Sequence, residues 1–147
     1  MTVINKSALV THSPEQMFRL VDNINDYPEY LPWCVNSEEL QRKGDSVEAR
    51  IDISHSGFKK SFSTRNKLTS FATIEMELLE GPFKYLIGTW SFEALGDENN
   101  PQGCKISLHL EFEFTSKLIG MTFGKVFGKI ASSMVDSFTE RASKVYA

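Results

Sequence analysis

The chain has few side chains of the kinds that carry out catalysis or bind metal ions. Its histidines are His12, His55 and His109, and none is followed by a histidine or cysteine at the spacing of a zinc motif. Cys34 and Cys104 lie far apart and form no CxxC motif, which is typical of reduced thiols in a cytosolic protein. The chain also lacks GxSxG, HExxH and phosphate-loop patterns. We therefore expect solvated histidines, no bound metal and no catalytic residues.

Paired carboxylates are the other feature that could support acid–base chemistry. Glu75 and Glu77 form one pair, and Glu111 and Glu113 form another. Each pair has the two-residue spacing that places both side chains on one face of a strand. Each alternates with apolar residues, so both pairs are predicted to lie on a solvated sheet face.

Aromatic side chains are more informative, since eleven Phe, four Tyr and two Trp make up 12% of the chain. Large rings that share one strand face either pack as ordinary core or line a ligand cavity, and the sequence leaves both alternatives open. Gly88 beside Trp90 would leave room, which favours a cavity slightly. The candidate cavity residues are Trp33, Phe62, Thr64, Asn66, Trp90, Phe92, Phe112, Phe114, Phe127, Ile130, Met134 and Phe138.

The segment Phe58–Leu68 has two faces with different chemistry. Thr64 and Asn66 share a face with the Phe62 ring, where they could form hydrogen bonds with the polar head group of a ligand. The opposite face carries a basic stripe formed by Lys59, Arg65 and Lys67. This stripe is either a solvated face balanced by Glu48 and Asp52 or a salt-sensitive docking surface for phosphate groups.

Two segments are candidates for a gate over the cavity. The segment from Tyr27 to Trp33 packs three aromatic residues and two prolines into seven residues, so a long regular helix is excluded. It is predicted to be a short helical turn or rigid loop that acts either as a hydrophobic plug or as a gate, with Tyr27, Tyr30 and Leu31 as its gate residues.

The second candidate gate lies in a predicted helix from about Ser116 to Val145. Gly120, Gly124 and Gly128 recur every four residues there, and each costs the helix roughly 1 kcal/mol relative to alanine. We therefore predict that this half of the helix is a mobile lid. The apolar stripe of the helix consists of Phe123, Phe127, Ile130, Met134, Phe138, Ala142 and Val145.

The remaining pattern defines the elements that must position these residues. Val3–Val10 is a predicted strand, and Ser13-Pro14-Glu15-Gln16 is the start of a short helix with a capping box. Period-two alternation from about Val35 to Phe114 predicts a meander of antiparallel strands with one dry face. Hydrophilic residues 96–103 are predicted to be an exposed loop. The expected fold is α+β, in which a curved antiparallel sheet wraps around the long C-terminal helix.

Length and charge narrow the choice of partners. We expect one domain over residues 1–147, which is ordinary for a chain of this length. The net charge of −3 gives no basic excess of the kind that DNA-binding proteins show. No segment has the pattern of a signal peptide or the length of a membrane span, so we expect a cytoplasmic protein with at most peripheral membrane contact.

Several segments, in this order, resemble the coenzyme Q-binding, polyketide cyclase-like family of the START superfamily, which also holds bacterial ribosome association toxins. The matching segments are Ser13–Phe18, Tyr27–Cys34, Thr64–Asn66, Gly81–Phe83, Leu86–Phe92, Met134–Phe138, Arg141-Ala142 and Val145-Tyr146. The resemblance implies a helix-grip (START/Bet v 1-like) fold that binds a hydrophobic isoprenoid ligand such as ubiquinone. The resemblance implies that the protein requires no cofactor, although it could hold a bound ubiquinone or similar isoprenoid lipid.

Three functions follow from these observations. The first, which the resemblance implies, is non-enzymatic binding of a ubiquinone-type ligand in support of respiratory electron transport. The second is that of a ribosome association toxin that binds the large ribosomal subunit and blocks subunit association, which the resemblance implies. The third, aromatase or cyclase chemistry, is disfavoured because no acid–base set is visible.

Overall fold

The computed structural model describes residues 2–55, 57–97 and 100–146. Within these residues, one antiparallel sheet has the strand order β1-β7-β6-β5-β4-β3-β2. The strands are β1 Thr2–Val10, β2 Cys34–Lys43, β3 Ser46–His55, β4 Phe58–Thr69, β5 Thr73–Glu80, β6 Phe83–Asp97 and β7 Asn100–Phe114. From β2 to β7, strands that are consecutive in the sequence are neighbours in the sheet, which confirms the predicted meander, and β1 pairs with β7.

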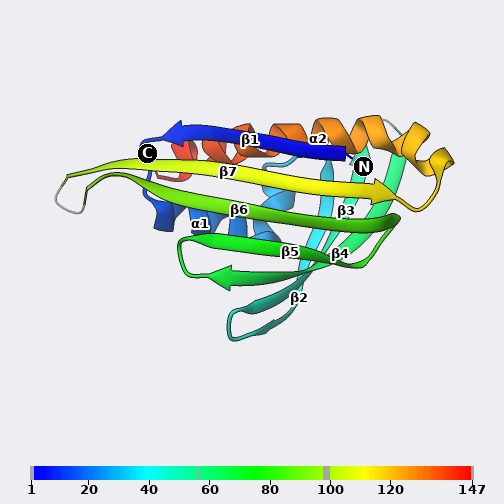
Figure 1. Ribbon diagram of the computed structural model, residues 1–147, viewed down its shortest axis with the longest axis horizontal. Coiled ribbons are helices and arrows are strands. Elements are labelled where there is room, and N and C mark those ends of the chain that lie inside the picture. The colour runs from blue at the N-terminus through cyan, green and yellow to red at the C-terminus, as the bar shows by residue number, and fades with distance from the viewer. Residues whose placement is uncertain (1, 56, 98–99, 147) are drawn as a thin grey trace.

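Three helices lie on one side of this sheet (Figure 1). They are α1 Pro14–Asp22, the 3-10 helix η1 Ile24–Glu29 and the long helix α2 Lys117–Val145. In Figure 1, α2 runs behind β1 and β7, and the sheet curves around it. The α+β architecture predicted from the sequence is therefore confirmed.

Local sequence explains where the helices begin. Ser13 and Gln16 form the predicted capping box: the Gln16 backbone N donates to Ser13 Oγ at 3.1 Å, and the Ser13 backbone N donates to Gln16 Oε1 at 3.0 Å. Ser116 caps α2 by accepting a hydrogen bond from the Ile119 backbone N at 3.2 Å. Both helices therefore begin at the residues that the sequence indicates.

The apolar stripe of α2 faces the sheet, with one exception. Phe123, Phe127, Ile130, Phe138 and Ala142 are buried, and Met134 is half-buried. Val145 was expected in this stripe and is 48% exposed, so that prediction is wrong. Contact with α1 at this end is made by the following residue, whose phenol donates a hydrogen bond to a backbone carbonyl of α1 (Tyr146 Oη to Gln16 O, 3.1 Å).

The prediction of an exposed loop over residues 96–103 is wrong for most of the segment. Gly96 pairs with Pro101 and Asp97 pairs with Asn100, so β6 and β7 continue into this region (Figure 1). Strand pairing depends on backbone groups, and hydrophilic side chains do not prevent it. Gly103 is required on β7, since an added Cβ would lie 2.0 Å from the Val10 carbonyl oxygen. Residues 98–99 of the predicted loop lie outside the described residues.

Gly128 gives a direct test of the glycine pattern in α2. An added Cβ at this position meets no heavy atom within 4 Å, so the Gly128→Ala variant is expected to gain helix propensity without a clash. We expect the free energy of unfolding to rise by about 1 kcal/mol, measured by urea denaturation. If the first half of α2 is a mobile lid, its amide hydrogens should also exchange more slowly in this variant. A less stable Gly128→Ala protein would contradict the prediction.

Candidate ligand-binding cavity

A cavity of about 60 Å³ lies between the sheet and α2. Side chains from η1, from strands β3 to β7 and from α2 form its wall, so the cavity is enclosed by the elements that the fold brings together. Its lining residues are Ile24, Tyr27, Trp33, Ala49, Ile51, Ile53, Phe62, Thr64, Asn66, Met76, Leu86, Trp90, Leu108, Leu110, Phe127, Ile130, Ala131 and Met134.

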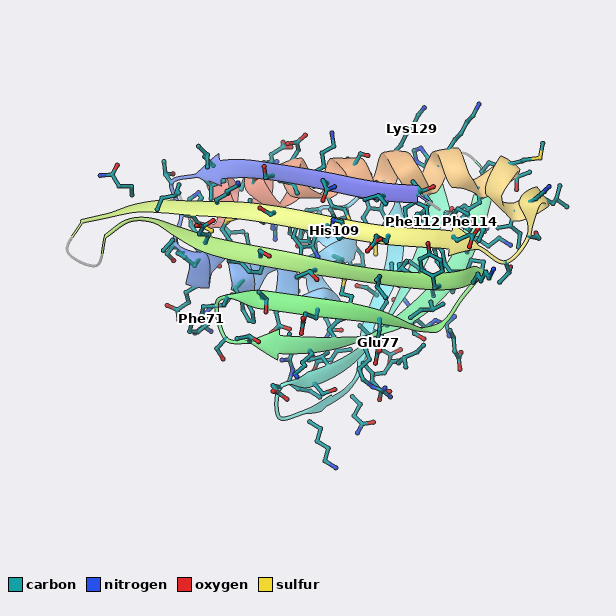
Figure 2. The ribbon with its side chains drawn as sticks, viewed as in Figure 1. Phe71, Glu77, His109, Phe112, Phe114 and Lys129 are labelled. Atoms are coloured by element: carbon teal, nitrogen blue, oxygen red, sulfur yellow. The ribbon has the colours of Figure 1, made fainter. Side chains whose placement is uncertain are left out.

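Most of the residues proposed from the sequence lie in this wall. Those that the structure brings together there are Trp33, Phe62, Thr64, Asn66, Trp90, Phe127, Ile130 and Met134. Four others lie outside the wall, namely Phe92, Phe112, Phe114 and Phe138. Phe112 and Phe114 (Figure 2) belong to an aromatic cluster in which both rings pack against Phe83 and Phe127.

The other two rings support the cavity from behind. Phe138 contacts Trp90 edge-on at 5.3 Å between ring centroids and also touches Tyr27 and Tyr30. Phe92 packs edge-on against Phe18 of α1 at 5.5 Å. Phe138 therefore packs directly behind two lining side chains, Trp90 and Tyr27, whereas Phe92 packs against α1.

Sequence reasoning missed about half of the wall. The missed residues are Ile24, Ala49, Ile51, Ile53, Met76, Leu86, Leu108, Leu110 and Ala131. Most belong to the dry faces that period-two alternation had marked, so their direction was predictable. Their position opposite α2 was not, because it depends on how the sheet curves.

Polar groups interrupt the apolar wall at one place on β4. Thr64 and Asn66 are 5% and 7% exposed, and the Thr64 hydroxyl donates to Asn66 Oδ1 at 2.8 Å. Trp33 also lines the cavity, and its Nε1 is buried with no hydrogen-bond partner within the described residues. An unpaired buried donor is costly unless a ligand or water accepts from it.

The segment from Tyr27 to Trp33 forms part of the wall, with the residues up to Glu29 inside η1. Tyr27 lines the cavity and its hydroxyl donates to the Val21 carbonyl, while burial raises the pKa of its phenol. Tyr30 and Leu31 do not line the cavity. The Tyr30 hydroxyl is buried without a partner among the described residues, and the Arg141 guanidinium lies 4.8 Å from the centre of its ring.

Arg141 also joins η1 to α2 directly. Its Nη2 lies 3.2 Å from Glu29 Oε2, at the opposite end of the chain. A Ser37 hydroxyl bond to the Ile24 carbonyl fastens η1 to β2 as well. The candidate gate is therefore held on both sides, and opening it requires these contacts to separate.

The glycines lie apart from the cavity. Gly120 and Gly124 face the Phe114 ring and line an outer groove with Lys117 and Lys125, so they do not border the internal space. Gly88 does not leave room either, because an added Cβ would lie 2.8 Å from both Met76 Cε and Leu110 Cδ1. The interpretation that Gly88 opens the cavity is wrong, since neighbouring side chains occupy that space.

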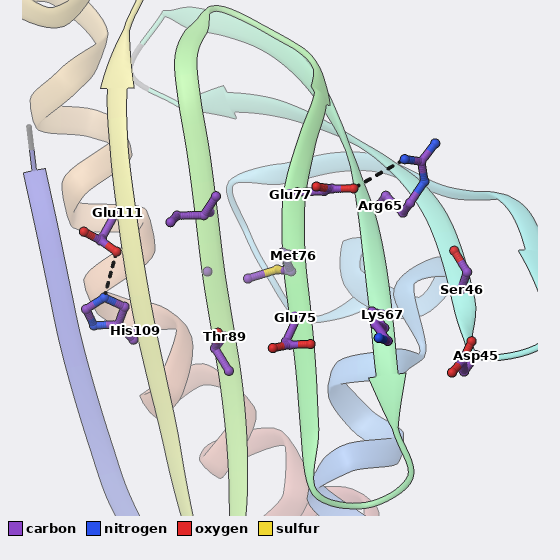
Figure 3. Close-up of a pocket in the computed structure, with 12 residues that line it drawn as sticks. Asp45, Ser46, Arg65, Lys67, Glu75, Met76, Glu77, Thr89, His109 and Glu111 are labelled. Atoms are coloured by element: carbon purple, nitrogen blue, oxygen red, sulfur yellow. Dashed lines mark hydrogen bonds and ion pairs between the residues drawn. The ribbon is translucent and has the colours of Figure 1, made fainter.

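Arg65 and Lys67 of the basic stripe lie on the opposite, outer face of the sheet (Figure 3). Arg65 forms ion pairs with Glu77 at 3.3 Å and with Glu48 at 3.5 Å. Lys67 lies in the same shallow groove as Glu75, and Lys59 lies at the start of β4. Arg65 is therefore neutralised by neighbouring acids, while Asp52, the other acid expected to balance the stripe, pairs with Arg50 at 3.0 Å.

The remaining titratable groups include His109 and the two cysteines. His109 is exposed and contacts Asn5 and Glu111 (Figures 2 and 3). No group of three His, Cys, Asp or Glu side chains in the described ranges could hold a metal ion. Burial raises the pKa of the Cys34 and Cys104 thiols to about 11, which keeps them protonated and poorly reactive near neutral pH.

Sequence comparison finds relatives of two kinds. The chain is 46% identical over 147 residues to the ribosome association toxin RatA of Escherichia coli K12. This alignment covers 100% of this chain and 90% of the relative. The chain is 28% identical over 135 residues to the mitochondrial coenzyme Q-binding protein of Dictyostelium discoideum, over 89% of this chain and 64% of the relative.

Solved structures share the fold. A START superfamily protein from Mycobacterium smegmatis superposes with a TM-score of 0.80 at 21% identity, over 97% of this chain and 98% of that one. The Zhui aromatase/cyclase of a Streptomyces species superposes with a TM-score of 0.77 at 12% identity, over 99% and 96%. The sheet and C-terminal helix are thus those of the START/Bet v 1-like fold. The family model described as polyketide cyclase / dehydrase and lipid transport matches residues 10–139, and the chain belongs to that family.

Proposed function

We propose that this protein binds a hydrophobic isoprenoid ligand with a carbonyl-bearing head group, of the ubiquinone type, in support of respiratory electron transport. The observation that carries the proposal is the set of buried polar groups in an otherwise apolar wall: the Thr64–Asn66 pair and the unpaired Trp33 Nε1. The Trp33 indole N–H and the Asn66 side-chain amide are donors that can recognise a carbonyl oxygen, while the surrounding side chains suit an isoprenoid tail. A relative named for coenzyme Q binding supports the same ligand class.

Ligand entry requires the cavity to enlarge. Sites for small organic ligands usually measure about 300–1,000 Å³, whereas this cavity measures about 60 Å³. Tyr27 from η1 and Met134 from α2 both border it, so separation of η1 from α2 would expand it. The Glu29–Arg141 ion pair and the contacts of Phe138 with Tyr27 and Tyr30 must then stretch or break.

The proposed activity is binding without catalysis. Among the described residues, the lining side chains include no carboxylate, histidine or lysine, so this part of the wall provides no residue that accepts or donates a proton near neutral pH. An aromatase/cyclase shares this fold, but chemistry depends on the side chains of the site and not on the scaffold.

Ala49→Val tests the ligand proposal by filling the cavity. Ala49 is buried on β3 and lines the space, and valine adds two methyl groups with good strand propensity. We expect affinity for a short-chain ubiquinone analogue to fall about tenfold or more, while stability changes by less than about 1 kcal/mol. Quenching of tryptophan fluorescence reports binding directly, because Trp33 and Trp90 both line the cavity.

The control for this experiment is Ala94→Val, an exposed alanine on β6 that does not line the cavity. It should leave quinone affinity unchanged. Equal affinities for wild type, Ala49→Val and Ala94→Val would show that quinone does not enter this space, and would count against the proposal.

Ribosome association is the second candidate function, and full-length similarity to proteins named for it favours it. Binding to ribosomal RNA would rest on Lys59, Arg65 and Lys67, of which only Arg65 is ion-paired within the described residues. A Lys59→Gln/Arg65→Gln/Lys67→Gln variant should then sediment less with large ribosomal subunits than wild type, and the difference should shrink at high salt. Lys6→Gln/Lys43→Gln/Lys105→Gln makes the same charge change elsewhere and is the control.

A further inference from the structure

The first half of α2 exposes two large apolar side chains to solvent. Leu118 and Met121 are 71% and 76% exposed. They share the outward face of the helix with Lys125 and Lys129, since residues three, four and seven positions apart line the same side. Figure 2 shows Lys129 directed away from the sheet. This outward face is amphipathic along its length, with apolar residues in the first turns and lysines in the next.

The opposite face of the same turns is fixed by packing. Phe123 is 1% exposed and contacts Phe114 and Phe58 at ring distances of 5.8 and 6.4 Å, while Gly120 and Gly124 bring the helix close to Phe114. Leu118 and Met121 are thus not needed for the core. Burying them elsewhere would gain free energy that the isolated molecule does not use.

The local charge is opposite to that of the whole chain. Residues 117–135 include Lys117, Lys125 and Lys129 and no Asp or Glu, although the net charge of the protein is −3. Two further exposed lysines, Lys59 and Lys60, follow Phe58, which touches this part of the helix. Glu113 is the acidic residue in the described lining of the outer groove that Lys117 and Lys125 border. Its Oε2 lies 3.9 Å from Lys84 Nζ.

We propose that this face docks on the surface of an anionic lipid bilayer. Leu118 and Met121 insert below the phosphates, and the three lysines of the helix contact lipid phosphate groups. Apolar burial and basic charge act together in membrane-surface binding, and this face offers both, with the apolar residues in the first turns and two of the lysines in the turns that follow. A phosphate backbone such as RNA would use the lysines but would offer no apolar layer for the two exposed side chains, so a bilayer explains more of the surface.

Docking in this way would place the cavity next to the membrane. Phe127, Ile130 and Met134 line the cavity from the inward side of α2, beginning in the turns that carry Lys125 and Lys129 on the outward side. A lipid-soluble ligand could therefore pass between bilayer and cavity along one helix. The docking proposal goes beyond ligand binding and does not depend on it, because vesicle association can be measured without any quinone.

Co-sedimentation with vesicles tests the proposal. The probe is phosphatidylcholine vesicles with about one third phosphatidylglycerol, compared with pure phosphatidylcholine vesicles. Wild type is expected to bind the anionic vesicles and to bind the neutral ones at least tenfold less. Lys117→Gln/Lys125→Gln/Lys129→Gln should weaken binding by about fivefold per lysine, and Leu118→Ser/Met121→Ser should weaken it by about tenfold or more.

Matched controls separate this face from general charge and hydrophobicity. Lys6→Gln/Lys43→Gln/Lys105→Gln removes the same charge, and Leu9→Ser/Leu40→Ser removes two residues that are 72% and 49% exposed on strands. Both controls should bind anionic vesicles like wild type, and urea denaturation should show that every variant remains folded. Wild type that ignores anionic vesicles, or helix variants that bind them like the controls, would overturn the proposal. Loss of ribosomal subunit binding with no vesicle binding would instead assign the face to RNA.

Discussion

Replacing Phe138 with alanine is expected to lower the free energy of unfolding by about 3–5 kcal/mol. Phe138 is fully buried in α2 and lies among Trp90 of β6 and the Tyr27 and Tyr30 rings of the η1 region, at centroid distances of 5.3, 5.5 and 5.8 Å. Its ring thus joins the long helix, the sheet and the gate segment. The loss combines the transfer free energy of the ring with the cavity it leaves, because these elements cannot all collapse into it.

Urea denaturation followed by circular dichroism measures this effect, with Phe138→Leu as the matched variant. Leucine keeps most of the apolar volume, so we expect it to cost less than about 2 kcal/mol. Phe138→Ala should also free Tyr27 and Tyr30 and so accelerate amide exchange in η1. A stability loss of less than about 1 kcal/mol for Phe138→Ala would show that Phe138 is not central to this contact.

Phe138 also shows what could be predicted from the sequence. Helical spacing placed it on the buried stripe of α2, and this was correct, because one residue every three or four positions must face the sheet. The sequence also suggested that Phe138 lines the cavity, but the structure places it behind the wall. Trp90 and Tyr27 stand between Phe138 and the cavity, and neither lies near it in the sequence.

The same distinction applies to the strands. Alternation predicted the inward direction of Ala49, Ile51 and Leu108, since side chains on one face share a period of two. It gave no information on curvature, which decides whether an inward residue faces α2, another strand or the cavity. Gly88 illustrates the difficulty: a missing side chain suggested space, but Met76 and Leu110 from neighbouring strands fill it.

Charge balance was predictable only in outline. Arg65 was expected to lie on a solvated face near Glu48, and the pair register of β3 with β4 brings them together. Its second partner, Glu77 of β5, could not be identified before strand pairing was known. Ion pairs across strands can be predicted only when the register of the strands is known. A single sequence determines the register only where the turns are short and regular.

The buried pair Thr64–Asn66 yields the second large expected effect, and it separates folding from ligand binding. The double variant Thr64→Val/Asn66→Leu replaces both partners of a buried hydrogen bond with apolar groups of similar shape, so the free energy of unfolding should change by less than about 1 kcal/mol. Affinity for a short-chain ubiquinone analogue should fall between about tenfold and a hundredfold, because the carbonyl of the ligand loses its partners.

A ligand control makes this test specific. A hydrocarbon of similar length without carbonyl groups should bind the double variant at least as tightly as wild type, since the wall has become more apolar. Thr139→Val removes a hydroxyl of α2 that bonds to the Val135 carbonyl outside the cavity, and it should change neither affinity. Equal loss of both ligands would mean that the double variant closes the cavity. Unchanged quinone affinity would mean that Thr64 and Asn66 do not contact the head group. Recognition would then have to rest on Trp33 Nε1, which lines the cavity and has no hydrogen-bond partner among the described residues.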